Sequence, residues 1–271
     1  MNTTHVNGVD IEYEQVGHGE PMLLIHGSNL ADGLRPLTTA LSRRAASLSF
    51  IRYHRRGLGG SAGGRRPVST EEQAADALGL LDALDLPSAH ILGYSYGATV
   101  ALEAALSAPQ RVRSLVLLEP ILTEVPSWAE FSRGMEPVMK LYQAGDMEGA
   151  VTATFAALGG PTWPDLIRSV GTEALAMAIR DTETYYRVEA PALHRWTLDP
   201  QRAAALRAPV LSVRGMNSGQ FFAEGRQLLH RHFPDCADAD IPDASHLLFL
   251  QQPEAIATAV VSFIDRNRES G

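Results

Sequence analysis

The chain has 271 residues, of which 45% are hydrophobic and 20% are charged, and its formal net charge at pH 7 is −8. This composition is that of a folded globular protein and excludes an intrinsically disordered chain. The acidic balance argues against nucleic acid and anionic membranes as main partners. Residues 1–11 lack the apolar run of a signal peptide or a membrane helix, so the cytoplasm is the simplest location.

The first 118 residues alternate between strand and helix patterns. Apolar or alternating runs predict strands at 9–16, 22–25, 49–53, 90–92 and 112–118. Helical spacing and capping residues predict helices at 31–46, 70–84 and 98–108. The alternation returns with strands at 209–213 and 238–241 and helices at 221–233 and 253–266. Because parallel strands need crossover connections, this order predicts a mostly parallel sheet with helices on both faces.

No strand pattern is present between about residues 121 and 206. This stretch holds eight of the chain's 18 aromatic residues, and prolines interrupt its helical patterns. We predict a helical cap, residues 121–206, inserted into a core domain made of residues 1–120 and 207–271.

One motif between a predicted strand and a predicted helix indicates chemistry. Residues 93–97 read Gly-Tyr-Ser-Tyr-Gly, the form of a nucleophile elbow, in which small residues permit a sharp reversal and leave the serine hydroxyl exposed. A serine needs a base to accept its proton. Of the nine histidines, His246 fits best, because it follows the last predicted strand and precedes the last helix. The sequence therefore predicts Ser95 as nucleophile and His246 as base.

Together these motifs resemble the α/β-hydrolase superfamily. Further points of resemblance are His26-Gly27 after an early strand and the run Arg-Gly-Leu-Gly-Gly-Ser at 56–61 after the next. The resemblance implies an eight-stranded, mostly parallel sheet with an inserted helical cap. It also implies an oxyanion hole formed by the backbone N–H groups of Tyr96 and Ser28, with Asn29 as an adjunct. His54 stands where similar proteins usually carry an aspartate, and we interpret it as a structural residue.

The acid of the triad departs from the common pattern of the family. Family members usually carry an aspartate after the next-to-last strand, where this chain has Ser218. Glu119 ends the strand that follows the elbow, which is the acid position of haloalkane-dehalogenase-like and zearalenone-lactonase-like members. A carboxylate at the end of a buried strand is costly unless it is paired. We therefore expect Glu119 to orient His246, with Asp243 as the alternative.

Aromatic and apolar residues near these motifs predict a pocket for a bulky apolar substrate. The candidate substrate-binding residues are Asn29, Trp128, Tyr142, Phe155, Trp163, Tyr186, Trp196, Phe221 and Leu247. The chain shows neither the His-Glu-x-x-His metal motif nor the Gly-x-Gly-x-x-Gly dinucleotide motif, so we expect no metal and no cofactor.

The predicted activity is that of a cofactor-independent serine hydrolase of esterase or lactonase type, acting on an apolar small-molecule ester, lactone or thioester. One alternative is a carbon–carbon bond hydrolase for a β-diketone or dienone. Another is a non-hydrolytic cyclase or a ligand-binding descendant of the fold. The sequence leaves homo-oligomerisation open.

Overall fold

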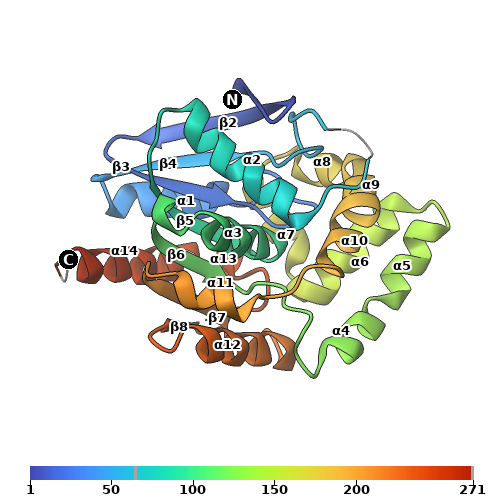
Figure 1. Cartoon of the computed structure of the whole chain (residues 1–271). Helices are drawn as coiled ribbons and strands as arrows, with labels where there is room; N and C mark the ends of the chain where they lie inside the picture. The colour runs from blue at the N-terminus through green and yellow to red at the C-terminus, as the bar shows by residue number, and fades with distance from the viewer. Residues whose placement is uncertain (64–65, 270–271) are drawn as a thin grey trace.

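The computed structural model describes residues 1–63 and 66–269 (Figure 1). Its strands are β1 (Asn2–Val6), β2 (Val9–Gly17), β3 (Glu20–Ile25), β4 (Leu48–Tyr53), β5 (Ala89–Tyr94), β6 (Val112–Leu118), β7 (Val210–Gly215) and β8 (Ala237–Ile241). They form one eight-stranded sheet in the order β1-β2-β4-β3-β5-β6-β7-β8. The pairs β1–β2 and β2–β4 are antiparallel, and every other pair is parallel. The predicted fold class is confirmed.

Helices cover both faces of this sheet. The core helices are α1 (Arg35–Arg44), α2 (Thr70–Ala83), α3 (Tyr96–Ser107), η1 (Pro109–Arg111), α12 (Gln220–His232), α13 (Leu248–Gln251) and α14 (Pro253–Glu269). Apolar residues of α2, α3 and α12 share one buried cluster, and those of α1, α13 and α14 share another. Residues along β3 alternate between the two clusters: Leu23 and Ile25 belong to the first, Met22 and Leu24 to the second. The sheet is therefore buried on both sides, as a parallel sheet requires.

The segment between β6 and β7 is helical throughout its regular elements. These are α4 (Trp128–Gly134), α5 (Glu136–Gln143), α6 (Met147–Gly159), α7 (Trp163–Val170), α8 (Ala174–Arg180), α9 (Thr182–Thr184), η2 (Tyr185–Glu189), α10 (Ala190–Leu193) and α11 (Pro200–Ala205). Several of them, α4 to α6 and α8 to α10, lie together on one side of the molecule as a cap-like layer (Figure 1). Near the end of the segment the chain is attached to α3, because Trp196 and Arg202 both bond Glu103, at 2.8 and 2.6 Å. The exact cap limits, 121 and 206, remain a prediction.

Among the strands, β1 is the one that the apolar patterns did not predict. Its residues are mostly polar and exposed, and it pairs with β2 through a two-residue turn at Asn7 and Gly8. Both residues have positive φ, 47° and 81°. Asn-Gly is the pair that such hairpin turns favour, so the signal for this strand lies in its turn.

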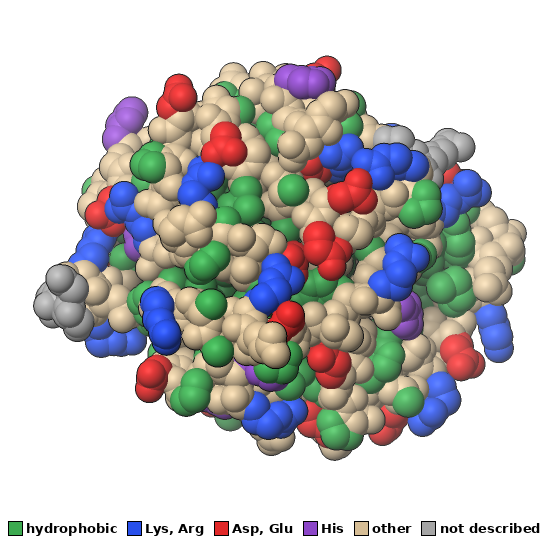
Figure 2. All heavy atoms as spheres, viewed as in Figure 1, with side chains coloured by type: hydrophobic (Ala, Val, Ile, Leu, Met, Phe, Trp, Pro, Cys, Tyr) green, Lys and Arg blue, Asp and Glu red, His purple; other side chains and the backbone are tan. Residues whose placement is uncertain are grey.

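The surface carries both signs of charge. On the face shown in Figure 2, basic and acidic side chains are interspersed. Within residues 1–63 and 66–269, no helix has the length and hydropathy needed to cross a membrane.

Candidate active site

Ser95 lies on a strained turn between β5 and α3. Its φ of 54° is in the left-handed region, and its N–H donates to the carbonyl oxygen of Leu118 at 2.9 Å. The flanking glycines are sterically required, because a Cβ on Gly93 would lie 2.4 Å from the oxygen of Gly97. A Cβ on Gly97 would lie 2.2 Å from the oxygen of His26. The turn therefore has the geometry of a nucleophile elbow.

Three side chains from distant segments form one hydrogen-bonded series. Nε2 of His246 lies 2.9 Å from Oγ of Ser95, and Nδ1 of His246 lies 2.6 Å from Oε2 of Glu119. An ionised carboxylate accepts only, so Nδ1 carries the proton and Nε2 is free to accept from the serine hydroxyl. His246 and Glu119 are each 3% exposed, which keeps both hydrogen bonds out of competition with water.

The structure places Glu119, and not Asp243, beside His246. Glu119 begins the loop after β6, and its second oxygen, Oε1, accepts from the N–H of Gly215 at 2.8 Å. The Asp243 side chain is exposed. Ser218, at the usual family position of the acid, has a buried hydroxyl without a partner in the described residues.

Ser28 and Tyr96, whose backbone N–H groups are the predicted oxyanion donors, both line the cavity beside Ser95. Tyr96 is the first residue of α3, so its N–H has no acceptor within the helix and lies at the positive end of the helix dipole. Ser28 follows β3, and both residues line the same cavity as Ser95 and His246. His26 fixes the loop before Ser28: its Nδ1 donates to the oxygen of Gly27 at 2.7 Å, and its Nε2 accepts from the Arg55 N–H at 3.0 Å. Burial and then the Arg55 charge lower the pKa of His26 well below its ordinary value, so the ring is neutral and keeps this tautomer.

The cavity above Ser95 is mostly apolar, and residues of α4, α6 and α10 form part of its lining. It encloses about 760 Å³ of space, including its mouth to solvent. Four of the residues predicted to bind substrate line it, namely Asn29, Trp128, Phe155 and Leu247. The cap aromatic Tyr185, which the sequence also offered as a lining residue, lines it too. Further lining residues that the sequence did not single out include Ile121, Phe131, Met135, Leu158 and Leu193. The lining is suited to a bulky apolar group.

Five predicted substrate-binding residues lie outside this lining and have other partners: Tyr142, Trp163, Tyr186, Trp196 and Phe221. Tyr142 stacks on Tyr186 with ring centroids 4.0 Å apart. The ring centroids of Trp163 and Phe155 are 5.9 Å apart, and those of Phe221 and Phe131 are 4.2 Å apart. Trp163 and Phe221 therefore support rings that line the cavity. The Trp196 indole is 3% exposed and bonds Glu103.

The sequence places Phe221 and Phe222 near the site in motif order, but its pattern does not predict which ring covers His246. Phe222 of α12 stacks on this imidazole with the ring centroids 4.3 Å apart and the planes 16° from parallel. Tyr94 contacts the same ring at 5.1 Å. The Phe-Phe pair after β7 indicates that an aromatic ring lies near the site. Which of the two rings faces His246 depends on the residue at which α12 begins.

The family model for the alpha/beta hydrolase fold matches residues 20–253. The chain belongs to this family. Over 269 residues it is 28% identical to RutD of Azorhizobium caulinodans, a protein provisionally named a carbamate hydrolase; the match covers 97% of this chain and 98% of that protein. An esterase from Thermogutta terrifontis has a similar structure, with a TM-score of 0.79, 22% identity, and coverage of 98% and 97%. The enol-lactonase of Burkholderia xenovorans LB400 also gives a TM-score of 0.79 at 22% identity, covering 97% of this chain and all of that one.

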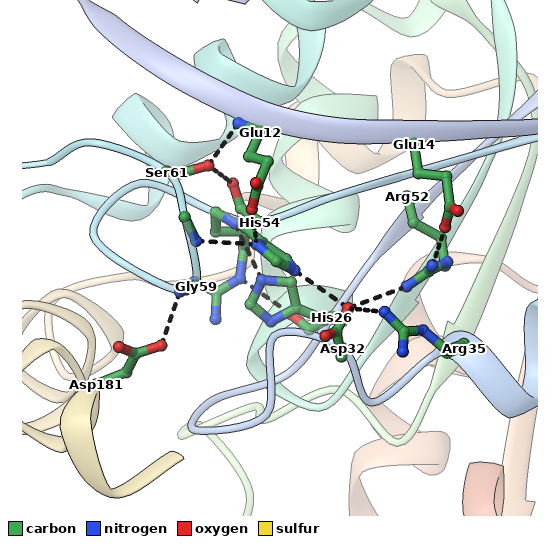
Figure 3. Close-up of polar contacts among 12 residues, drawn as sticks. Glu12, Glu14, His26, Asp32, Arg35, Arg52, His54, Gly59, Ser61 and Asp181 are labelled. Atoms are coloured by element: carbon green, nitrogen blue, oxygen red, sulfur yellow. Dashed lines mark hydrogen bonds and ion pairs between the residues drawn. The ribbon is translucent and has the colours of Figure 1, made fainter. Parts of the chain in front are cut away.

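In this α/β hydrolase the loop after β4 is braced by charged side chains (Figure 3). His54 lies between two carboxylates, with Nε2 3.3 Å from Oδ1 of Asp32 and Nδ1 2.8 Å from Oε2 of Glu12. Asp32 also pairs with Arg35 and Arg52, at 3.2 and 3.5 Å. Burial favours the neutral form of Asp32, but His54 and the two arginines outweigh burial and lower its pKa to about 2. These contacts are those of a structural brace between β2, β4 and the loop before α1.

The same loop of the hydrolase holds the cap. The N–H of Gly59 donates to Oδ2 of Asp181 at 2.7 Å, as Figure 3 shows, and burial raises the pKa of this aspartate. The hydroxyl of Thr184 donates to the oxygen of Gly57 at 2.7 Å. The end of α8 and the short α9 therefore sit directly on the glycine-rich loop.

Among the described residues there is neither a metal-binding cluster nor a reactive thiol. Within residues 1–63 and 66–269, no group of three or more His, Cys, Asp or Glu side chains is arranged to hold a metal ion. Cys236 is buried, and burial raises the pKa of its thiol to about 12. The thiol is therefore protonated at neutral pH and is a poor nucleophile.

Proposed function

We propose that this α/β hydrolase cleaves a carboxylic ester, lactone or thioester of a mostly apolar small molecule, without a cofactor, through an acyl-enzyme on Ser95. The observation that carries the proposal is the hydrogen-bonded series from Ser95 through His246 to Glu119, which opens onto an apolar cavity. A serine with a base and an orienting carboxylate is the arrangement that acyl transfer needs.

In the first half of the reaction, Oγ of Ser95 attacks the carbonyl carbon while Nε2 of His246 takes the hydroxyl proton. Glu119 holds the Nδ1 proton and stabilises the imidazolium that forms. The N–H groups of Ser28 and Tyr96 stabilise the negative oxygen of the tetrahedral intermediate, a contribution of roughly 3–4 kcal/mol per donor in other enzymes. The imidazolium then gives its proton to the leaving alcohol or thiol.

In the second half, a water molecule gives a proton to His246 and attacks the acyl carbonyl. Collapse of the second intermediate releases the carboxylic acid and returns the proton to Ser95. A lactone follows the same steps, except that its alcohol remains attached to the acyl group. The apolar lining, with Trp128, Phe131 and Phe155, favours an apolar group close to the scissile carbonyl.

The experiment is hydrolysis of p-nitrophenyl esters from acetate to decanoate by the wild type, Ser95→Ala and Ser218→Ala. Ser218 is a matched control because it too has a buried hydroxyl but does not line the cavity. We expect turnover by the wild type and Ser218→Ala, and its loss in Ser95→Ala. Equal turnover by Ser95→Ala would refute the acyl-enzyme. No turnover of any ester by a folded wild type would move the assignment to a specialised lactone, to a carbon–carbon bond or to a binding role.

A further inference from the structure

Arg55 places a guanidinium in the interior of the protein, beside residues 26–29. We call this segment the oxyanion loop, because it carries the Ser28 N–H. The Arg55 side chain is 1% exposed. Nε donates to the oxygen of His26 and Nη2 to the oxygen of Gly27, each at 3.0 Å. Nη1 contacts the side chains of Gln73 and Glu189. A buried charge is costly unless it is paired and hydrogen-bonded, and the proposed mechanism gives this charge no role.

The contact with Gly27 fixes the direction of an oxyanion donor. The carbonyl of Gly27 and the N–H of Ser28 belong to one peptide group, and in a planar trans peptide they point in opposite directions. Two donors hold this carbonyl, Nη2 of Arg55 at 3.0 Å and Nδ1 of His26 at 2.7 Å. Holding the oxygen therefore aims the Ser28 N–H, and the positive charge polarises the peptide so that the N–H is a stronger donor.

Arg55 also contacts the residue that supplies the other donor. Its guanidinium carbon lies 5.1 Å from the centroid of the Tyr96 ring, within the range of a cation–π interaction. The Tyr96 hydroxyl accepts from Nε2 of Gln73 at 3.2 Å, and the other end of the same amide contacts Arg55. One guanidinium thus supports both halves of the oxyanion hole.

The counter-charge of Arg55 comes from the cap. Glu189 is 1% exposed and ends η2, a single π-helical segment that begins at Tyr185. Tyr185 lines the cavity, while Glu189 pairs with Arg55. Isolated π-helical turns are frequent at functional sites. The segment of the cap that contacts the cavity therefore also holds the arginine behind the oxyanion loop.

We propose that Arg55 is a positioning residue for the oxyanion hole and that Glu189 sets its orientation from the cap. The proposal rests on the acyl-transfer function proposed above. Without the guanidinium, Ser95, His246 and Glu119 keep their mutual contacts, but the Gly27 carbonyl keeps only its bond from His26, so the Gly27–Ser28 peptide is held less firmly. The effect should fall on kcat more than on KM, because oxyanion donors act in the transition state.

The test compares Arg55→Met with Arg56→Met. Arg56 is a matched control, because it too is a buried arginine of this loop, but it pairs with Asp76 on α2. We expect Arg55→Met to lower kcat for p-nitrophenyl esters about 10- to 100-fold with KM changed less than about threefold. Arg56→Met should lower Tm to a similar extent but keep kcat within about threefold. Amide hydrogen exchange at residues 27–29 should quicken only in Arg55→Met.

A double variant separates positioning from stability. In Arg55→Met/Glu189→Met no buried carboxylate is left unpaired, so Tm should recover relative to Arg55→Met, while kcat stays low. Recovery of kcat together with Tm would overturn the proposal, and so would equal losses in Arg55→Met and Arg56→Met. If the wild type hydrolyses no ester, the ester form of the proposed function fails separately. Unchanged exchange at residues 27–29 in Arg55→Met would then overturn the positioning role by itself.

Discussion

Gly215 and Glu119 are joined by a hydrogen bond that leaves one carboxylate oxygen for His246. The Gly215 N–H, at the end of β7, donates to Oε1 at 2.8 Å, and Oε2 lies 2.6 Å from Nδ1 of His246. Glu119 itself has a positive φ of 47°, which turns its side chain away from the path of β6. The proposed acid thus follows one strand, β6, and is held by the neighbouring strand, β7.

Glu119→Gln tests this arrangement. The amide keeps the size of the side chain but cannot hold an imidazolium, and we expect kcat to fall roughly 10³- to 10⁴-fold, as when a triad carboxylate is lost elsewhere. Asp243→Asn should change kcat less than about threefold, because that side chain is exposed. The measurement is steady-state hydrolysis of the preferred p-nitrophenyl ester. A loss under about threefold in Glu119→Gln would remove the acid role from Glu119.

Replacing Phe155 should change the ester preference, whereas replacing Trp196 should change only the stability. Phe155 lines the cavity, so Phe155→Ala should enlarge it and shift the ester preference toward longer acyl chains, with about 3–5 kcal/mol of stability lost. Trp196→Phe leaves Glu103 without the indole donor, and should lower Tm without changing the preference. Values of kcat/KM across the acetate-to-decanoate series, with Tm for each variant, decide the matter. An unchanged chain-length profile in Phe155→Ala would show that the acyl group binds elsewhere.

Asp32 should make the free energy of unfolding depend on pH in the acid range. Its pKa in the folded protein is about 2, below the ordinary value of 3.8. A depressed pKa means that the stabilisation is present above pH 3.8 and is lost as the pH falls toward 2. Urea unfolding measured from pH 5 to pH 2 should show a decline in the free energy of unfolding that is shallower in Asp32→Asn. Identical slopes in the two proteins would mean that Asp32 gains nothing from its arginine partners.

The elbow should not tolerate a single added methyl group. In Gly97→Ala the Cβ would lie 2.2 Å from the backbone oxygen of His26, so the protein must shift the oxyanion loop or α3. We expect a loss of Tm and at least about a tenfold loss of kcat. Gly134→Ala, on α4, meets no atom within 4 Å and should be neutral or slightly stabilising. Normal activity in Gly97→Ala would contradict the close contact between α3 and the end of β3.

The core of this fold could be predicted from the sequence because its signals are local. Apolar strand runs, the capping box at Ser69 and the small residues around Ser95 each act over a few positions, and most predicted elements lie within a few residues of the observed ones. The cap is different, because its helices are short and broken by prolines. A π-helical segment at Tyr185 and Tyr186 adds a residue to the turn, so a helical period of 3.6 does not show that Tyr185 faces the cavity and Tyr186 faces Tyr142.

The directions of the Arg55 and Arg56 side chains could not be predicted from the sequence either. Arg55 and Arg56 are adjacent in a glycine-rich loop, yet one turns to the oxyanion loop and the other to α2. That difference is set by their partners: Asp76 lies on α2, the next helix along the chain, whereas Glu189 lies far from the loop in the chain.

The chain order of the candidate triad has a consequence during translation. The ribosome makes Ser95 and Glu119 first, then the helices that roof the cavity, and only afterwards His246 and the strand before it. A nascent chain that folds from its N-terminal side therefore carries its elbow, and then the cap, before it has a base. In the proposed mechanism the serine therefore remains a weak nucleophile until His246, which follows β8, has been made.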